Sequence, residues 1–170
     1  MPRIAHLVLL LLALPVLAGT RLRTPDEETL KAFRLTSENV RKAAAVARRL
    51  AGEVAKDPGL ARSTQYSRKH AATLDAKAKS LERDARIASA LRAESITARE
   101  YVMVQMTALQ AGLVAAMKAQ GVQVDPADLR EAMNPANVEF VEKHRKEMDE
   151  LGRSQEELRK VSKPAQDEEK

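Results

Sequence analysis

Histidine is the side chain best suited to bind haem or a metal ion at neutral pH, and this chain has three histidines, His6, His70 and His144. None belongs to a His-x-x-x-His pair or to a Glu-x-x-His pair on one helix face. The absence of cysteine removes thiolate metal sites and the Cys-x-x-Cys-His haem motif. His144 lies three residues after Val141 and four before Met148, on an apolar helical face. It is the one candidate ligand for a metal or haem that the sequence offers.

Methionine could supply a second haem ligand beside His144, and four are available: Met103, Met106, Met117 and Met148. A haem pocket normally has aromatic walls, however, and the chain has only two Phe, two Tyr and no Trp. Methionine also serves as a flexible filler of core space. We therefore expect His144 to be a hydrogen-bonded structural residue, and we expect no cofactor and no metal ion. A small-ligand or haem carrier is the alternative.

Catalysis requires polar groups that converge in a cavity, and the sequence offers no such set. It has six glycines, none in a phosphate-binding loop, and its serines lack the Gly-x-Ser-x-Gly pattern: Ser63, Ser67, Ser80, Ser89 and Ser95. Glu100 beside Tyr101 could do acid–base work. The spacing of Ile96, Thr97, Glu100 and Tyr101 is nevertheless that of a helix capping box with a hydrophobic staple. We expect no enzyme and no catalytic residue.

The amino terminus has the pattern of an export signal. Arg3 precedes the apolar run Leu7–Leu14, Pro15 interrupts it, and Val16-Leu17-Ala18 suits signal peptidase. The sequence predicts a signal peptide over residues 1–18, cleaved after Ala18, and a periplasmic or secreted mature protein. An uncleaved anchor is the alternative, but Leu7–Ala18 is shorter than the roughly 20 residues that span a bilayer.

Composition favours closely packed helices in one domain over residues 19–162, followed by a disordered charged tail over residues 163–170. With no disulfide and 2% aromatic residues, the core must be built from Ala, Leu, Val and Met. Cleavage of the signal peptide would remove one positive charge, Arg3. The mature chain would then have 28 Lys/Arg against 24 Asp/Glu, a net charge of +4. Residues 19–96 have a net charge of +7 and residues 121–170 of −4. Because acids and bases alternate along the helices, we expect no nucleic-acid partner.

Helix start and stop signals divide the mature chain into segments. Thr24, Pro25 and Glu27 predict a short helix towards Phe33. A cap at Thr36, with Leu35 and Val40 as a staple, predicts a helix that ends at Asp57-Pro58-Gly59.

A third helix is predicted over Ala61–Ala93, partly like a coiled-coil strand. Its narrow apolar seam would be Ala71, Leu74, Ala78, Leu81, Ala85, Ala88 and Leu91. Its solvent face would be basic: Lys69, Lys77, Lys79, Arg83 and Arg86.

The segment Ala98–Gln120 has no charge between Tyr101 and Ala116 and predicts a buried central helix that Gly121 ends. A membrane span there is disfavoured because Gln105, Thr107 and Gln110 interrupt it, so we expect no stable span after cleavage. Two further helices are predicted, from Asp125 to Met133 and from Asn134 to Leu151, with Met133 and Val138 as a staple. Gly152 would end the second, and a short restart at Ser154–Glu157 would bury Leu158 and Val161. The expected fold is an all-α bundle of about four main helices with short helices around the central one.

Two sequence segments resemble segments found in a group of small exported bacterial helical proteins of uncharacterised activity. They are Thr97-Ala98-Arg99-Glu100-Tyr101-Val102 and Asn134-Pro135-Ala136-Asn137-Val138-Glu139-Phe140-Val141-Glu142-Lys143-His144. The resemblance covers Leu35–Leu151 and implies no site. The start at Leu35-Thr36 is also similar to the Leu-Thr-x-x-Gln motif of exported helical chaperones, with Asn39 in place of Gln. Asn134 suits an N-cap, whereas Asn137 has no such explanation.

Three functions are compatible with these patterns. The first is a non-enzymatic binding or chaperone-like protein of the cell envelope that recognises apolar or acidic segments of envelope proteins or peptides. The second is the small-ligand or haem carrier. The third is a structural protein that self-associates through its opposite charge poles.

Overall fold

The structure, a computed structural model, describes residues 24–64 and 73–162. The predicted signal peptide, the charged tail and His70 lie outside the described residues, as do the side chains of Thr24 and Pro25 in the first predicted cap. All regular elements in the described ranges are helical, so the all-α class is confirmed.

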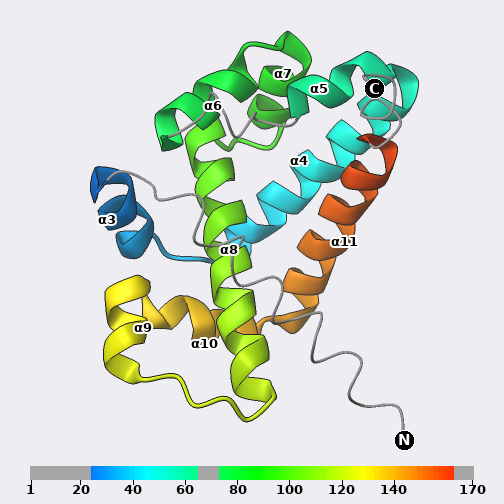
Figure 1. The fold of residues 1–170 in the computed structure, drawn as a ribbon. Helices are drawn as coiled ribbons and strands as arrows, with labels where there is room; N and C mark the ends of the chain where they lie inside the picture. Colours follow the sequence, from blue (N-terminus) through cyan, green and yellow to red (C-terminus); the bar gives the residue numbers. More distant parts are fainter. Residues whose placement is uncertain (1–23, 65–72, 163–170) are drawn as a thin grey trace, which may run out of the picture.

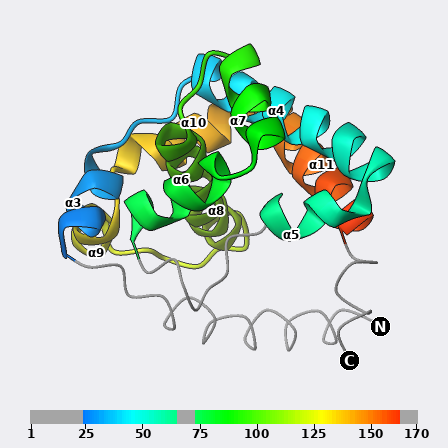
Figure 2. The same ribbon diagram turned by 90° about the horizontal axis from the view of Figure 1, so that it is seen from above.

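Three long helices dominate the described chain (Figure 1): α4 (Ser37–Lys56), α8 (Ala98–Ala119) and α11 (Arg145–Ser162). The shorter elements are α3 (Thr24–Ala32), the 3-10 turn η1 (Pro58–Leu60), α5 (Ala61–Thr64), α6 (Leu74–Glu82), α7 (Ala85–Ala93), α9 (Pro126–Ala132) and α10 (Pro135–Lys143). Viewed from above in Figure 2, α8 lies near the middle, with α4 and α11 on one side and α3 and α9 on the other.

The α4–α11 pair forms the most extensive helix contact in the described chain. The two helices run side by side in the same direction (Figure 1), from Ser37 near Glu147 to their ends near α5. Small side chains permit this close approach. Ala43, Ala47 and Ala51 are buried on α4, and on α11 the buried Ser154 hydroxyl donates to its own helix, to the Glu150 carbonyl at 2.8 Å.

The main core lies among α4, α6, α7, α11 and the N-terminal half of α8. Its fully buried large side chains are aliphatic, as the composition predicts: Val40, Val46, Leu50, Val54, Leu60, Leu74, Leu81, Ile87, Val102, Val104 and Leu151. A second, smaller cluster joins Ala111 of α8 to Met133 and Val138, with Leu129 of α9 packed against it. The predicted Met133–Val138 staple is therefore in place.

The predicted third helix is wrong as a continuous element. α6 ends at Glu82, and α7 begins after Asp84, whose backbone is extended and whose Oδ1 accepts a hydrogen bond from the Arg86 amide at 2.9 Å. An aspartate that caps a new helix satisfies amides that a continuous helix would bond to carbonyls. The buried face of α7 therefore differs from the predicted apolar seam. Ala85 is exposed, whereas Ile87 and Ala90 are buried.

Lys77 was predicted on the solvent face but is buried, with 7% of its surface exposed. Its apolar stem follows Leu74 and Leu81 into the interface, as long cationic side chains can. Burial lowers the pKa of Lys77, and the negative charge of Asp26 partly offsets this effect. Asp26 Oδ2 also accepts a hydrogen bond from the Leu74 amide at 3.0 Å, so this carboxylate ties α3 to the start of α6.

The predicted helix from Asn134 to Leu151 is also wrong, because it breaks at His144 (φ −109°, ψ 44°). α10 ends there, and α11 then continues through Gly152 to Ser162 instead of stopping at the glycine. A glycine in a helix interior costs about 1 kcal/mol relative to alanine. Packing of α11 along α4 outweighs that cost, so tertiary contact overrides the stop signal.

Candidate binding surface

Within the described residues, one apolar face of the C-terminal half of α8 is only partly covered. We call it the α8 stripe: Leu109, Gly112, Leu113 and Ala116. Leu109 is 70% exposed, Ala116 is exposed, and Gly112 and Leu113 are half-buried. Leu109 and Leu113 belong to neither of the core clusters. Isolated exposed leucines are ordinary, but an uncharged run of them along one helix face marks a surface that can bind an apolar partner.

The stripe continues a face that is buried at the other end of the same helix. Ala98 and Val102 lie on the side of α8 that reaches Leu109, Leu113 and Ala116 at helical spacing. Ala98 and Val102 are 1% and 0% exposed. The prediction that α8 is buried throughout was therefore wrong for its second half. There, α10 covers only the opposite side, through Ala111 and Val114.

Gly112 is the smallest residue of the stripe and, like Gly52 on α4 and Gly152 on α11, has open space beside it. A methyl group at its Cα would meet no atom within 4 Å, so no internal contact requires a glycine here. Since glycine weakens a helix interior, the residue is a net cost within the isolated chain. Together with Ala116 one turn later, it makes a flat strip on which another helix could lie closely.

α8 is the one described helix long and apolar enough to cross a membrane, although only 28% of its most apolar 18-residue window is buried. Length and composition alone are weak grounds for a span, since a core helix meets the same criteria. The N-terminal half of α8 is built into the main core, and Arg99 pairs with Asp75 of α6 at 2.9 Å. We therefore interpret α8 as a core helix whose second half is exposed.

His144, the candidate ligand, lies at the α10–α11 break. Its Nδ1 is 3.3 Å from the Ser37 hydroxyl and 3.2 Å from Glu147 Oε1, and its ring stacks on Phe140 at 4.3 Å. The Ser37 hydroxyl also donates to Glu147 at 3.3 Å. The pKa of the Glu147 carboxyl is lowered, first by a hydrogen bond from its own backbone, then by His144 and least by Ser37. A catalytic triad would use both ring nitrogens, one for serine and one for the acid. Here both partners meet Nδ1, so the arrangement joins α4 to α11.

No group of three or more potential metal ligands occurs within the described ranges. Three of the methionines considered as haem ligands, Met103, Met106 and Met148, pack against the main core. Met117 lies elsewhere, half-buried near the end of α8. The structure thus does not bring these methionines together around His144.

Glu100 and Tyr101 lie at a helix start, as predicted. The Thr97 hydroxyl caps α8 by accepting a hydrogen bond from the Glu100 amide at 3.1 Å, and Ile96 and Tyr101 are both buried. The other half of the predicted capping box, a hydrogen bond from the Thr97 amide to the Glu100 carboxylate, is not formed among the described residues. At Thr36 both halves of a capping box are present, because Asn39 Oδ1 accepts from the Thr36 amide at 2.9 Å.

Asn137, which the sequence left unexplained, is 1% exposed and bridges to the segment before α4. Its Oδ1 accepts from the Leu35 amide at 2.8 Å and its Nδ2 donates to the Phe33 carbonyl at 2.9 Å. Asn134 caps α10, as predicted, by accepting from the Ala136 amide at 3.0 Å. Both asparagines therefore have structural roles.

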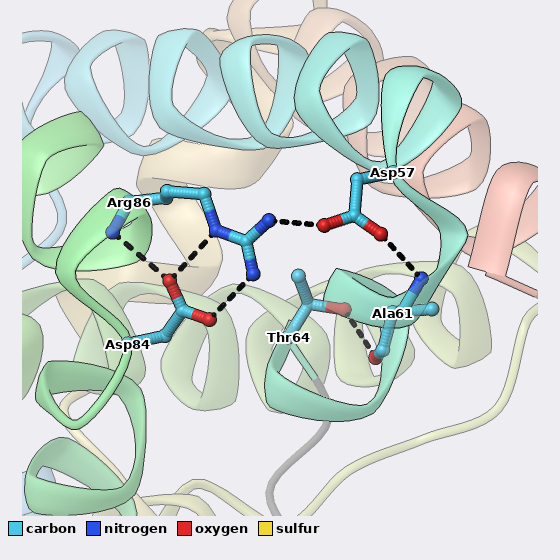
Figure 3. A network of polar contacts seen from close by, with 6 residues as sticks. Asp57, Ala61, Thr64, Asp84 and Arg86 are labelled. Carbon is cyan, nitrogen blue, oxygen red and sulfur yellow. Dashed lines mark hydrogen bonds and ion pairs between the residues drawn. The ribbon is translucent and has the colours of Figure 1, made fainter.

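Arg86 joins two carboxylates from distant turns (Figure 3). Its guanidinium binds Asp84 through Nη2 at 2.9 Å and through Nε at 3.1 Å, and it reaches Asp57 through Nη1. Asp57 also accepts from the Gly59 amide at 3.0 Å. These bonds lower the pKa of Asp57 and of Asp84, with the Arg86 hydrogen bond as the largest cause in each. The side chains of Asp57, Asp84 and Arg86 lie at the surface, and their ion pairs hold α7 against the end of α4.

No protein-family model, no curated protein and no solved structure matches this chain. Its class is therefore defined by its own geometry: an all-α protein in which the α8 stripe is an exposed apolar face. The sequence did not indicate that surface, because the uncharged stretch between Tyr101 and Ala116 predicted a buried helix. The sequence feature that could have indicated an exposed face was Gly112, in the middle of that helix.

Proposed function

We propose that this chain is an exported, non-enzymatic protein of the cell envelope, periplasmic or secreted, that binds apolar segments of other polypeptides on the α8 stripe. The observation that carries the proposal is Leu109, which is 70% exposed within an uncharged helix face. Its burial against a partner would contribute roughly 1.5–3 kcal/mol, a useful fraction of a micromolar affinity.

The remaining candidate groups support a binding role over catalysis. Asn134, Asn137 and His144 are each accounted for by a helix cap or an interhelical contact, and Glu100 lies in the first turn of α8, where its backbone amide bonds to the Thr97 cap. Chaperone-like binding needs no reacting group, only an apolar surface that tolerates different sequences, and flat strips of small and flexible side chains suit that task.

The proposal is tested by a double substitution, Leu109→Gln and Leu113→Gln, in the chain without residues 1–18. The substitutions should leave the fold intact, because Leu109 is exposed, Leu113 is half-buried, and neither belongs to a core cluster. Binding of a fluorescent apolar helical peptide should weaken about tenfold or more, the effect of losing ~1.4 kcal/mol. Ala55→Gln, an exposed position on α4, is the matched control and should bind as the parent does. Unchanged peptide binding by the double variant would contradict the proposal.

Export is tested separately. Mass spectrometry of the protein recovered from the periplasm or medium should give a mature chain that begins at Gly19. Recovery of the intact chain from the cytoplasm would contradict the envelope location, whatever the peptide assay shows.

A further inference from the structure

The first described helix, α3, buries one face against the rest of the described chain. Asp26 and Leu30 are 9% and 6% exposed, and they lie four residues apart on that face. Phe33 follows three residues later on the same side, where it is half-buried and packs against the main core. Glu27 and Glu28 are exposed. α3 therefore has the anchor spacing of an amphipathic helix that lies in a groove.

The surface under α3 is formed by α8 and the start of α6, two helices that pack against each other. α3 contacts α8 (Figure 1), and Asp26 Oδ2 accepts a hydrogen bond from the Leu74 amide of α6 at 3.0 Å. Lys77, one turn further along α6, is buried as well, and the negative charge of Asp26 opposes the lowering of its pKa by burial. The surface thus offers a backbone donor and a buried cation, and Asp26 interacts with both.

The connection between α3 and α4 allows α3 to leave this surface without disturbing the core. Residues 33–36 are not helical, and Asn137 holds the Phe33 carbonyl and the Leu35 amide. Thr36 then begins α4 with its own capping box. A displacement of α3 can therefore end at Phe33. Because a helix of nine residues is marginal in water by itself, α3 depends on its docked face.

We propose that the surface of α6 and α8 under α3 is a second docking surface, which accepts a helical segment of another polypeptide with Asp and Leu four residues apart. α3 is the built-in competitor that such a segment displaces. The buried pair Asp26 and Leu30 defines the chemistry of the ligand: a carboxylate for the Leu74 amide and the Lys77 ammonium, and a leucine for the apolar contact. This inference goes beyond the proposed function, because it concerns an acidic ligand and residues outside the α8 stripe.

The inference is tested by nuclear magnetic resonance on the isotope-labelled chain without residues 1–18. In the released variant, Asp26→Ala with Leu30→Ala, the Leu74 amide loses its carboxylate acceptor, so its proton resonance should move while most other resonances stay. The probe is a synthetic peptide of residues 24–32, capped at both ends, which should return the Leu74 resonance towards its position in the parent. The parent should bind this peptide about tenfold more weakly or less, because its own α3 competes at a high effective concentration.

Changes in the peptide and in α6 identify the charge that is recognised. Asp26→Asn in the peptide keeps an oxygen for the Leu74 amide but removes the charge beside Lys77, so its affinity for the released variant should fall about tenfold. Lys77→Met in the released variant keeps an apolar stem and should make the two peptides bind equally. Glu27→Gln with Glu28→Gln in the peptide is the matched control and should bind like the parent peptide, because both positions are exposed.

Two Ala-rich peptides of about 18 residues, long enough to be helical alone, extend the test to foreign sequences. One carries Asp and Leu four residues apart, and the other carries them two apart. The first should restore the Leu74 resonance of the released variant. The second should not, because residues two apart do not share a helix face.

The outcomes separate this inference from the proposed function. A Leu74 resonance that no peptide restores in the released variant overturns the inference and leaves binding on the α8 stripe standing, and so does equal affinity of the Asp26 and Asp26→Asn peptides. Peptide binding that is lost in the Leu109→Gln and Leu113→Gln variant would place the peptide on the stripe and also overturn the inference. A dimer of the parent in sedimentation equilibrium that the released variant does not form would assign the surface to α3 of a second copy and overturn its assignment to another polypeptide.

Discussion

The side chain of Asn137 is bonded to the backbone on both sides of Arg34, including the amide of Leu35, 102 residues earlier in the chain. This pair of hydrogen bonds fixes α10 against the segment that leads into α4. It also closes the chain around the N-terminal end of α4, where Asn39 Nδ2 donates to the Arg34 carbonyl at 3.0 Å. One buried amide group thus organises the meeting point of three segments.

Asn137→Ala should lower the free energy of unfolding by about 2–4 kcal/mol, because two hydrogen bonds are lost and the Leu35 amide and Phe33 carbonyl are left without their partner. Urea denaturation followed by circular dichroism measures the change. Asn134→Asp is the control: aspartate keeps the capping oxygen, so the change should stay within about 0.5 kcal/mol. A loss below about 1 kcal/mol for Asn137→Ala would show that water replaces the amide there.

Thr97→Ala should destabilise the fold by about 1 kcal/mol, the usual cost of a lost N-cap, and Thr97→Ser should be nearly neutral. Glu100→Gln should be tolerated, since the Glu100 side chain does not complete the capping box. Thermal melts of the three variants check these expectations. If Glu100→Gln melts like the parent but fails to restore the function of a deletion strain, Glu100 belongs to a functional site.

Ser95→Gly should stabilise the protein by about 0.5–1 kcal/mol. Ser95 has φ +51°, a conformation that costs about 1–2 kcal/mol for a residue with a side chain. The Ser95 amide donates to the Arg92 carbonyl at 3.0 Å, and the Ile96 amide donates to the Leu91 carbonyl at 3.2 Å. This pair of hydrogen bonds is a common helix ending in which the left-handed residue is usually glycine. A higher melting temperature is the expected result.

Gly121→Ala provides the opposite case, because Gly121 has φ +81° and ends α8 by the same pattern, with its amide 3.0 Å from the Lys118 carbonyl. The alanine variant should lose about 1 kcal/mol. If Ser95→Gly and Gly121→Ala shift the melting temperature in the same direction, the left-handed backbone conformation does not determine how these two helix ends contribute to stability.

Arg86→Gln should flatten the loss of stability in acid. In the folded chain the Arg86 hydrogen bonds hold the pKa of Asp57 and of Asp84 below the ordinary 3.8. The stability these carboxylates contribute is therefore present above pH 3.8 and is lost as the pH falls through their lowered pKa values. Melting temperatures measured across this acid range should fall less steeply in the variant. Arg92→Gln, at an exposed position on the same helix, should keep the slope of the parent.

The sequence by itself determined where four of the described helices begin. Thr36, Thr97, Asp125 and Asn134 cap the helices that their types and spacing predicted. Such signals can be read from sequence because a capping bond joins residues two or three positions apart. The all-α class and the Ala- and Leu-rich core follow from composition in the same local way.

Only the tertiary structure decided which faces are covered. Lys77 is buried, Asn137 is bonded to Leu35, and His144 interrupts a helix beside Ser37, each through a contact with a distant part of the chain. The α8 stripe is the clearest case. Leu109 and Val102 lie in one uncharged stretch of α8, and their side chains differ in exposure because the described neighbouring helices pack over the first half of α8 and cover one face of the second half only partly. Periodicity gives the direction of a side chain, but burial depends on what packs there.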